Sequence, residues 1–293
     1  MPDNLTQDEA RSRASVITVS SYQVELDLTG GDTTFTSITV ARFQAANGGS
    51  ETFINLTAPK VLEITLNGSP LSLDAFDGDR ITLARLNQDN ELRVVAECAY
   101  SRSGEGLHRF TDPADGGVYL YSDLETFDAH RVYACFDQPD LKATYELTVT
   151  APTEWTVISN MAPGSEEPAG DSAGDPAKRW HFPPTPVMST YITAVAAGPY
   201  HVVRDSHDGI PLGIYCRQSL AQYLDADELF EVTRQGFDFY HQAFGVRYAF
   251  GKYDQLFVPE FKEGAMENAG CVTFLEDYIF RSRVTDFARE ARA

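Results

Sequence analysis

The chain has 293 residues, of which 43% are hydrophobic and 23% are charged, a globular composition that excludes a disordered chain. This length predicts two domains, each large enough to bury a core. The formal net charge of −20 excludes nucleic acid and anionic membrane surfaces as expected partners, because both repel an acidic protein.

No apolar stretch approaches the roughly 20 residues that span a bilayer, and the first residues carry no basic and hydrophobic leader. The cysteines Cys98, Cys135, Cys216 and Cys271 lie far apart and form no C-x-x-C pair. We therefore expect reduced thiols, a cytoplasmic location and no membrane partner.

Residues 16–198 show the two-residue hydrophobic period of half-buried strands. The alternating positions are Tyr22, Val24, Leu26 and Leu28; Leu62, Ile64 and Leu66; Leu92, Val94, Ala96, Cys98 and Tyr100; and Tyr145, Leu147 and Val149. Asn67-Gly68 is a strong hairpin turn signal before Leu71 and Leu73. Many short strands without a long helical pattern predict an antiparallel sandwich or saddle.

The segment from Ala162 to Lys178 is rich in Pro, Gly, Glu and Asp, which predicts a long hairpin tip or a mobile loop. The pattern changes after residue 199. Asp225 lies three residues before Glu228, a capping-box spacing, and a helical face ends at Gly245.

That helical face consists of Leu229, Val232, Gly236, Tyr240 and Phe244. A strand is expected at 253–258, and a final helix begins near Arg283. We predict a β-rich domain over residues 1–199 and, over residues 200–293, the incomplete start of an α/β domain.

Gly264-Ala265-Met266-Glu267-Asn268 lies between two extended apolar segments and places a carboxylate beside an amide. With its flanking residues, this pentapeptide resembles the exopeptidase signature of zinc aminopeptidases of the aminopeptidase N type. The resemblance implies a thermolysin-like second domain. It also implies that Glu267 binds the free amino terminus of a peptide and that the neighbouring backbone pairs with this peptide as an added strand.

The segment from Tyr121 to Asp140 resembles the second hallmark of the same family, a Gln-x-Glu element followed by Asp-Ala-Arg-Arg and Phe-Asp-Glu-Pro. By this resemblance Glu125 also reaches the substrate ammonium. Asp123 stands where the family has glutamine, so the extra charge either favours basic first residues or alters the pocket in another way. In the alternative interpretation, Glu125 forms only a surface ion pair with Arg131.

The other residues of the two motifs have supporting roles in this interpretation. Arg131, Asp128 and Asp137 fix the loop through ion pairs, and Asn268 orients Glu267 or a substrate carbonyl. Gly264 and Ala265 act through their backbone, where a larger side chain would obstruct the peptide. The predicted substrate-binding residues are thus Asp123, Glu125, Gly264, Ala265, Met266, Glu267 and Asn268.

None of the six histidines has the spacing of a zinc site, since no His-Glu-x-x-His occurs in the chain. The family resemblance implies Zn²⁺ in the intact enzyme, and the expected partner is a peptide with a free amino terminus. The chain ends inside a predicted helix, so we expect it to hold no zinc and no catalytic residue and to be inactive alone. The alternatives are a non-catalytic module that binds peptide amino termini and an interaction domain; oligomeric state is not predicted.

Overall fold

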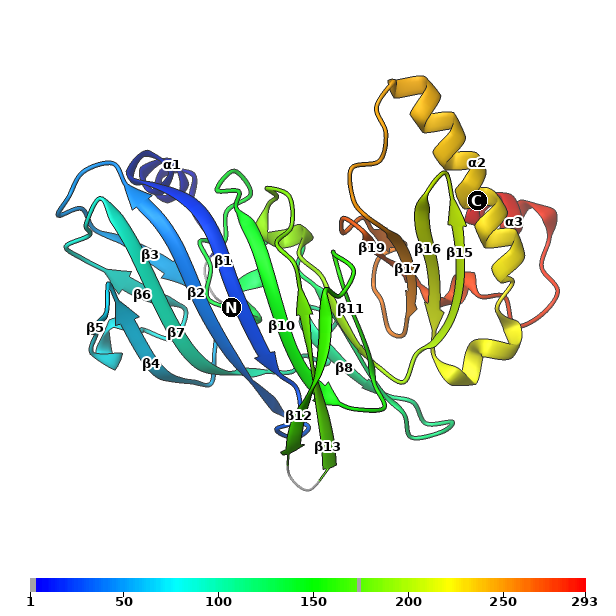
Figure 1. Cartoon of the computed structure of the whole chain (residues 1–293), viewed down its shortest axis with the longest axis horizontal. Coiled ribbons are helices and arrows are strands. Elements are labelled where there is room, and N and C mark those ends of the chain that lie inside the picture. The colour runs from blue at the N-terminus through cyan, green and yellow to red at the C-terminus, as the bar shows by residue number, and fades with distance from the viewer. Residues whose placement is uncertain (1–3, 173–174) are drawn as a thin grey trace.

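The structure, a computed structural model, describes residues 4–172 and 175–293. Its two halves lie side by side, the first built almost entirely of strands and the second of a sheet with helices (Figure 1). The predicted fold class, a β-rich amino-terminal domain followed by the start of an α/β domain, is confirmed. The predicted boundary at residues 199–200 falls between strands β14 and β15, and the division into domains stays a prediction.

The first half contains one large and two small sheets. Within the described residues the large sheet has the strand order β12-β13-β10-β1-β2-β7-β4-β5. Its strands are β1 (Ile17–Asp27), β2 (Thr34–Ala45), β4 (Lys60–Leu66), β5 (Ser69–Pro70), β7 (Asp89–Ala99), β10 (Thr144–Pro152), β12 (Ser165–Ser172) and β13 (Asp175–Phe182). The small sheets contain β11 (Thr156–Ser159), β14 (Val195–Gly198), β9 (Val118–Asp123) and β8 (Gly106–Thr111), and β3 (Thr52–Asn55) with β6 (Arg80–Leu83).

The second half has a sheet of order β15-β16-β17-β19-β18. Its elements are β15 (His201–His207), β16 (Ile210–Cys216), α2 (Ala226–Phe244), β17 (Tyr253–Val258), β18 (Ala265–Met266), β19 (Cys271–Leu275) and α3 (Asp286–Arg292). Short 3-10 turns occupy Leu73–Ala75, Ala129–Arg131, Thr190–Ile192, Gln218–Tyr223 and Glu276–Tyr278. Leu229 and Phe230 pack α2 onto this sheet, in one core cluster with Leu212 and Ile214 of β16.

The hydrophobic alternation correctly predicts β1, β4, β7 and β10 of the large sheet, but it did not single out β2. The predicted antiparallel arrangement is wrong for β1 and β10, which pair in parallel. Tyr22, Val24 and Leu26 are all at most 3% exposed, and β1 carries the buried-exposed alternation along most of its length. Leu62 is an exception, because it is 41% exposed rather than in the core. The pairing of β4 with β7 shifts register between Val61 and Glu63, so that Val61 faces inward instead.

Helix α1 (Gln7–Val16) was not predicted, because the sequence interpretation begins its strands at residue 16. The available signal was Thr6-x-x-Glu9, which forms a capping box: the Thr6 hydroxyl accepts from the Glu9 amide and the Glu9 carboxylate accepts from the Thr6 amide. Arg13 of this helix is buried and donates to Asn55 and Gln138, so polar contacts anchor α1 to the end of β3 and to the loop before β10.

The predicted capping box of α2 is wrong. Asp225 is the N-cap residue of the helix but makes no side-chain capping bond. Its carboxylate and that of Glu228 face Arg292 of α3, at 3.9 and 2.8 Å. An ion pair between two helices therefore replaces the local contact. The C-terminal prediction is confirmed, since Gly245 ends the helix in the left-handed conformation, with φ 63°.

Between Ala162 and Lys178 the hairpin prediction is confirmed, although the strands extend further than expected. Strand β12 pairs with β13 from Ser165 to Ser172, and residues 173–174 of the predicted tip lie outside the described residues. The final helix is α3, which begins at Asp286 behind the N-cap Thr285 rather than near Arg283. Among the described residues, none of the helices combines the length and the hydropathy of a membrane span.

Candidate functional site

The first predicted segment lies at the end of β9, which pairs with β8 from Val118 to Asp123. Asp123 is the last strand residue and is partly buried, whereas Glu125, two residues on, is exposed. Among the described residues the Glu125 carboxylate has no ion pair. Arg131, its proposed surface partner, pairs instead with Asp128 and, at 3.9 Å, with Glu105. The surface ion-pair alternative for Glu125 is therefore not observed.

Charged side chains hold the loop after Glu125 in place, as the sequence analysis predicts. Arg131 forms an ion pair with Asp128. Asp137 accepts from the backbone amide and ring Nδ1 of His130, at 3.1 and 2.8 Å, and from the hydroxyl of Thr190 at 2.8 Å. These contacts are internal to the β-rich half, so they give Glu125 a rigid support.

Asp123 has an unusual carboxyl group. Burial raises its pKa, which the Glu125 amide partly opposes, and the nearby carboxylates of Asp128, Glu125 and Glu263 raise it further, to about 6. Of the three carboxylates around Asp123, that of Asp128 pairs with Arg131, while those of Glu125 and Glu263 have no ion-pair partner among the described residues and leave a negative field at the end of β9. Such a field favours a cation in this position.

The second predicted segment forms the edge of the second sheet. In β18, Ala265 pairs with Phe274 and Met266 with Thr273 of β19, both antiparallel. The outer edge of β18 carries no further strand among the described residues. Met266 is buried at 2% exposure, while Gly264, Ala265 and Glu267 are exposed. The segment therefore presents an open backbone edge and one free carboxylate.

Gly264 is sterically restricted in this segment. A Cβ added to Gly264 would lie 3.1 Å from the Tyr278 hydroxyl oxygen. The Gly264 carbonyl also accepts from the Leu275 amide at 3.1 Å, which extends the pairing of the segment with β19. A larger residue here would require the Tyr278 side chain to shift by a few tenths of an ångström. The predicted role of Gly264 in the approach of a peptide stays a prediction.

Asn268 is predicted to orient Glu267 or a substrate carbonyl. Its amide nitrogen makes no hydrogen bond to Glu267 among the described residues, and the role toward a substrate stays a prediction. Its side chain is 1% exposed, and within the described part of the chain its buried Nδ2 has no hydrogen-bond partner. The Asn268 carbonyl accepts from the Cys271 amide at 3.0 Å, so the residue closes the turn into β19.

The turn after Asn268 is held by the first half of the protein. Asn160, just beyond β11, donates to the Ala269 carbonyl at 2.8 Å. The same amide group donates to Ile192 and accepts from Ala194, so its orientation is fixed. Gly270 has φ +72°, and a Cβ on it would lie 2.2 Å from the Asn160 carbonyl oxygen. The sequence analysis missed Asn160; the Ala269-Gly270 dipeptide was the only signal of this close approach.

The two segments meet along the seam between the halves. Phe261 and Met266 share a core cluster with Tyr119 and Tyr121 of β9, and the rings of Tyr121 and Phe261 lie 5.8 Å apart. The Glu263 carboxylate helps to raise the pKa of Asp123, so these two side chains lie within reach of each other's charge. The structure therefore places the end of β9 and the residues just before Gly264 at the same seam. Joint binding of one ammonium by Glu125 and Glu267 stays a prediction.

A buried salt-bridge network reinforces this seam. Arg217, 6% exposed, donates from Nε and Nη2 to the two carboxylate oxygens of Glu276, each at 2.7 Å. It also pairs with Asp112 of the first half and lies over the Phe110 ring at 5.2 Å. Breaking such a network leaves a buried charge without a partner, so it holds the halves in a fixed arrangement.

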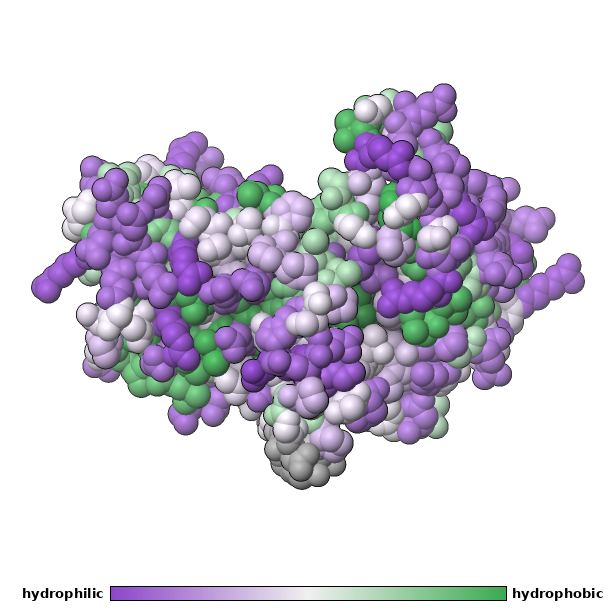
Figure 2. All heavy atoms as spheres, in the orientation of Figure 1, coloured by the Kyte–Doolittle hydropathy of each residue, from purple (hydrophilic) through white to green (hydrophobic). Residues whose placement is uncertain are grey.

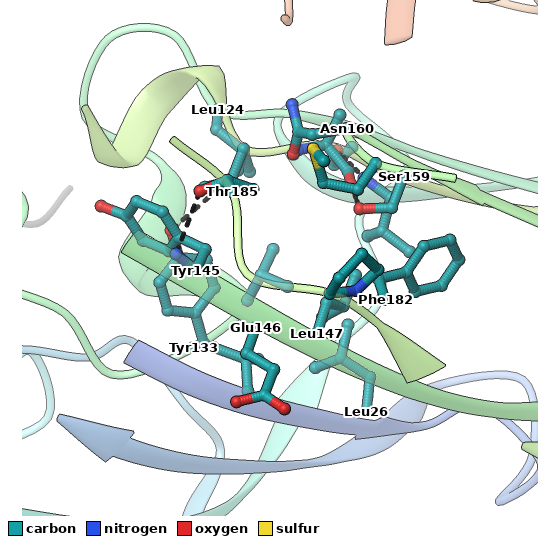
Figure 3. Close-up of a pocket in the computed structure, with 18 residues that line it drawn as sticks. Leu26, Leu124, Tyr133, Tyr145, Glu146, Leu147, Ser159, Asn160, Phe182 and Thr185 are labelled. Atoms are coloured by element: carbon teal, nitrogen blue, oxygen red, sulfur yellow. Dashed lines mark hydrogen bonds between the residues drawn. The ribbon is translucent and has the colours of Figure 1, made fainter. Parts of the chain in front are cut away.

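A cavity of about 30 Å³ lies behind the first segment, under Leu124. Figure 3 shows Leu124 and Asn160 on one side of it and Leu26, Leu147 and Phe182 on the other. This volume accommodates one or two water molecules rather than a substrate. The candidate site is therefore the exposed surface formed by Glu125 and the β18 edge.

Among the residues that the structure describes, five of the six histidines have a hydrogen-bond or ion-pair partner, in each case an acidic side chain. His108 contacts Glu260, His130 contacts Asp137, His181 contacts Glu167, and His207 and His241 contact Asp238 and Asp208. In residues 4–172 and 175–293 no group of three or more His, Cys, Asp or Glu residues could hold a metal ion. The donor set present does not fit a zinc site. All four cysteines are buried and free.

Two family descriptions match the chain. Residues 19–192 match the peptidase M1 N-terminal domain, and residues 228–292 match the peptidase family M1 domain. The first range lies within the β-rich half, and the second covers the second half from α2 onward. The chain belongs to the peptidase M1 family.

The similar proteins are aminopeptidases by name. The chain is 54% identical to aminopeptidase N of Streptomyces lividans over 99% of its own length and 34% of that protein. It is 28% identical to aminopeptidase N of Acetobacter pasteurianus over 74% of the chain and 66% of that protein, and 35% identical to human glutamyl aminopeptidase over 58% of the chain and 18% of that protein. The chain thus spans only part of the length of these relatives.

Proposed function

We propose that this chain is the part of a zinc-dependent aminopeptidase that binds the amino terminus of a peptide substrate. We call the proposed binding surface, formed by Asp123, Glu125 and residues 264–268, the amino-terminus site. The observation that carries the proposal is the exposure of Glu125 and Glu267, both without an ion-pair partner among the described residues, beside an open strand edge. Membership of the M1 family supports the same reaction class.

The chemistry of the amino-terminus site explains why an exopeptidase would use it. A free amino terminus differs from an internal amide by one positive charge. A carboxylate binds this ammonium by a charge-assisted hydrogen bond, whereas an internal amide would leave the carboxylate without a counter-charge. The outer edge of β18 can pair with the peptide backbone and set its direction.

In the proposal, the metal and the catalytic residues belong to parts of the intact enzyme outside these 293 residues. The lack of a fitting donor set in the described residues supports this assignment, as does the partial coverage of the relatives. We therefore propose that the chain alone binds peptides without cleaving them. Zinc would supply the hydrolytic chemistry of the intact enzyme, and this chain would select and orient the substrate.

Calorimetry with a short peptide and its N-acetylated form tests the binding part of the proposal. The free amino terminus should bind at least tenfold more tightly, which corresponds to one charge-assisted hydrogen bond. Equal binding of the two peptides would contradict the amino-terminus site. Glu154→Gln, at an exposed acidic residue of the first half, is the control for loss of a carboxylate at Glu125 or Glu267, because it removes one negative charge outside the amino-terminus site.

A chromogenic alanyl or lysyl amide tests the catalytic part. The purified chain should release no product with or without added zinc. Turnover that depends on zinc would show that the chain holds its own catalyst. Comparison of lysine-first and alanine-first peptides in the binding assay then tests whether Asp123 favours a basic first residue; Asp123→Gln should remove such a preference.

A further inference from the structure

His108 connects the two halves of the molecule at a buried position. The residue lies in β8 and is 1% exposed. Its Nε2 lies 3.0 Å from the Glu260 carboxylate, which belongs to the second half and is 57% exposed. The contact therefore joins a fixed side chain of the first half to the surface segment that precedes Gly264.

The hydrogen bonds of His108 determine its tautomer. Nδ1 accepts from the Gly104 amide at 3.1 Å, so Nδ1 carries no proton. Nε2 must then carry the proton and donate to Glu260. Burial and the charges of Arg102 and Lys262 lower the His108 pKa, whereas Glu260 raises it, and the balance favours this neutral form. The Tyr121 ring packs against the imidazole at 5.0 Å and restricts its orientation.

Glu260 lies at a conformationally demanding point of the chain. Its φ is +57°, the left-handed region that a residue with a Cβ adopts only when other contacts compensate. Strand β17 ends two residues earlier, at Val258, and Phe261 enters the core shared by both halves. The turn at Glu260 thus sets the path of the chain from β17 to Gly264.

We propose that His108 is a positioning residue that holds residues 260–268 in place, so that Glu125 and Glu267 lie close enough to bind one ammonium group. The position of residues 260–268 is argued from the His108–Glu260 contact. The consequence for ammonium binding rests on the proposed function. Lys262, whose ammonium lies 3.1 Å from Glu105, makes a second contact between the same segments. Both side chains of the Lys262–Glu105 pair are about half exposed, so this ion pair contributes little to holding the segment in place.

Hydrogen exchange tests the positioning role independently of peptide binding. The reporters are the amides of Cys271 and Leu275, which donate to the carbonyls of Asn268 and Gly264. Glu260→Ala should accelerate their exchange about tenfold, the effect of losing a hydrogen bond to a charged group. Alanine keeps the Cβ, so the cost of the positive φ does not change. Exchange in β1 should stay the same.

Matched variants separate positioning from general loosening. Glu260→Gln keeps an oxygen that accepts from His108 and should retain most of the protection. His108→Leu should resemble Glu260→Ala, and the double variant should add little to either, because both remove the same contact. Lys262→Ala, the control, should change exchange by less than twofold. If His108→Leu does not fold, Glu260→Ala still tests the positioning role, because the Glu260 side chain lies largely outside the core.

The calorimetric comparison of free and acetylated peptides gives the functional readout. Glu260→Ala should reduce the preference for a free amino terminus by about tenfold, and Lys262→Ala should not. Unchanged exchange and unchanged preference in Glu260→Ala would overturn the positioning role and leave the proposed function intact. If the parent chain shows no preference but Glu260→Ala accelerates exchange, the local geometry is confirmed, and both the proposed function and the effect of His108 on it fail.

Discussion

The two halves of the protein cover their apolar residues to different degrees. In the first half, one extensive core cluster includes Tyr22, Phe43 and Phe136, each at most 2% exposed. In helix α2 of the second half, only two residues, Leu229 and Phe230, are buried. The remaining aromatic residues of the predicted helical face, Tyr240 and Phe244, are 55% and 73% exposed, although they stack on each other at 5.7 Å.

The exposed part of α2 lines an apolar groove of about 570 Å³. Figure 2 shows hydrophobic residues at the top of the second half, where α2 ends in Figure 1. The inner side of the second sheet is better covered, since Leu256, Val258 and Phe261 share a core with Tyr119 and Tyr121 of the first half. The first half therefore forms one extensive core, whereas the second half has a smaller core of its own and shares a further cluster with the first half across the seam.

The largest expected effect on the free energy of unfolding is the difference between a buried and an exposed aromatic residue. Phe136→Ala should lower the free energy of unfolding by about 3–5 kcal/mol, because Phe136 is fully buried and packs edge-to-face on Phe43 at 5.0 Å. Phe244→Ala should change it by less than about 0.5 kcal/mol. Urea unfolding followed by the fluorescence of Trp155 and Trp180, both in the first half, measures the difference. Similar losses in the two variants would contradict the comparison.

A pair of glycines tests the seam itself. Gly270→Ala should cost about 2 kcal/mol or more, because the position has a positive φ and an added Cβ would collide with Asn160. Gly236→Ala in α2, where the added Cβ meets no atom within 4 Å, should stabilise the chain by about 0.5–1 kcal/mol. Thermal unfolding of both variants is the measurement. A stabilising Gly270→Ala would show that the seam is looser than described.

A smaller effect is expected from Asp123→Asn. The folded-state pKa of about 6 lies above the ordinary value of 3.8, so the folded protein favours the protonated carboxyl. Stability from this group is present below pH 3.8 and is lost as the pH rises through about 6. Asparagine should therefore stabilise the chain at pH 7 by on the order of 1 kcal/mol, allowing for partial exposure. This gain should disappear by pH 4 in urea titrations; a gain independent of pH would exclude titration of Asp123 as its cause.

Local patterns predicted most of the architecture. The two-residue period located β1, β4, β7 and β10 of the large sheet, Asn67-Gly68 located a hairpin, and Gly245 located the end of α2. Contacts between distant segments account for the errors. The bulge that exposes Leu62 depends on pairing with β7, and Arg292 draws Asp225 away from its capping role. Helix α1 was predictable, since its capping box is visible in the sequence.

The candidate site was predictable only as two separate motifs. The sequence identifies Glu125 and Glu267 by resemblance, and the structure adds that both are exposed near a shared seam. The supporting contacts of His108 with Glu260 and of Asn160 with Ala269 join residues more than 100 positions apart. No periodicity or local spacing encodes such contacts, so the sequence did not reveal them.

Binding of one ammonium group by both Glu125 and Glu267 is the main proposal for this protein. A double-mutant cycle with Glu125→Gln and Glu267→Gln, read by calorimetry as the affinity for a short peptide with a free amino terminus, measures this directly. Each substitution should weaken binding about tenfold, and the double variant should depart from the product of the single effects by about threefold or more. Two independent effects that simply multiply, or no loss of affinity in either variant, would contradict a shared ammonium site.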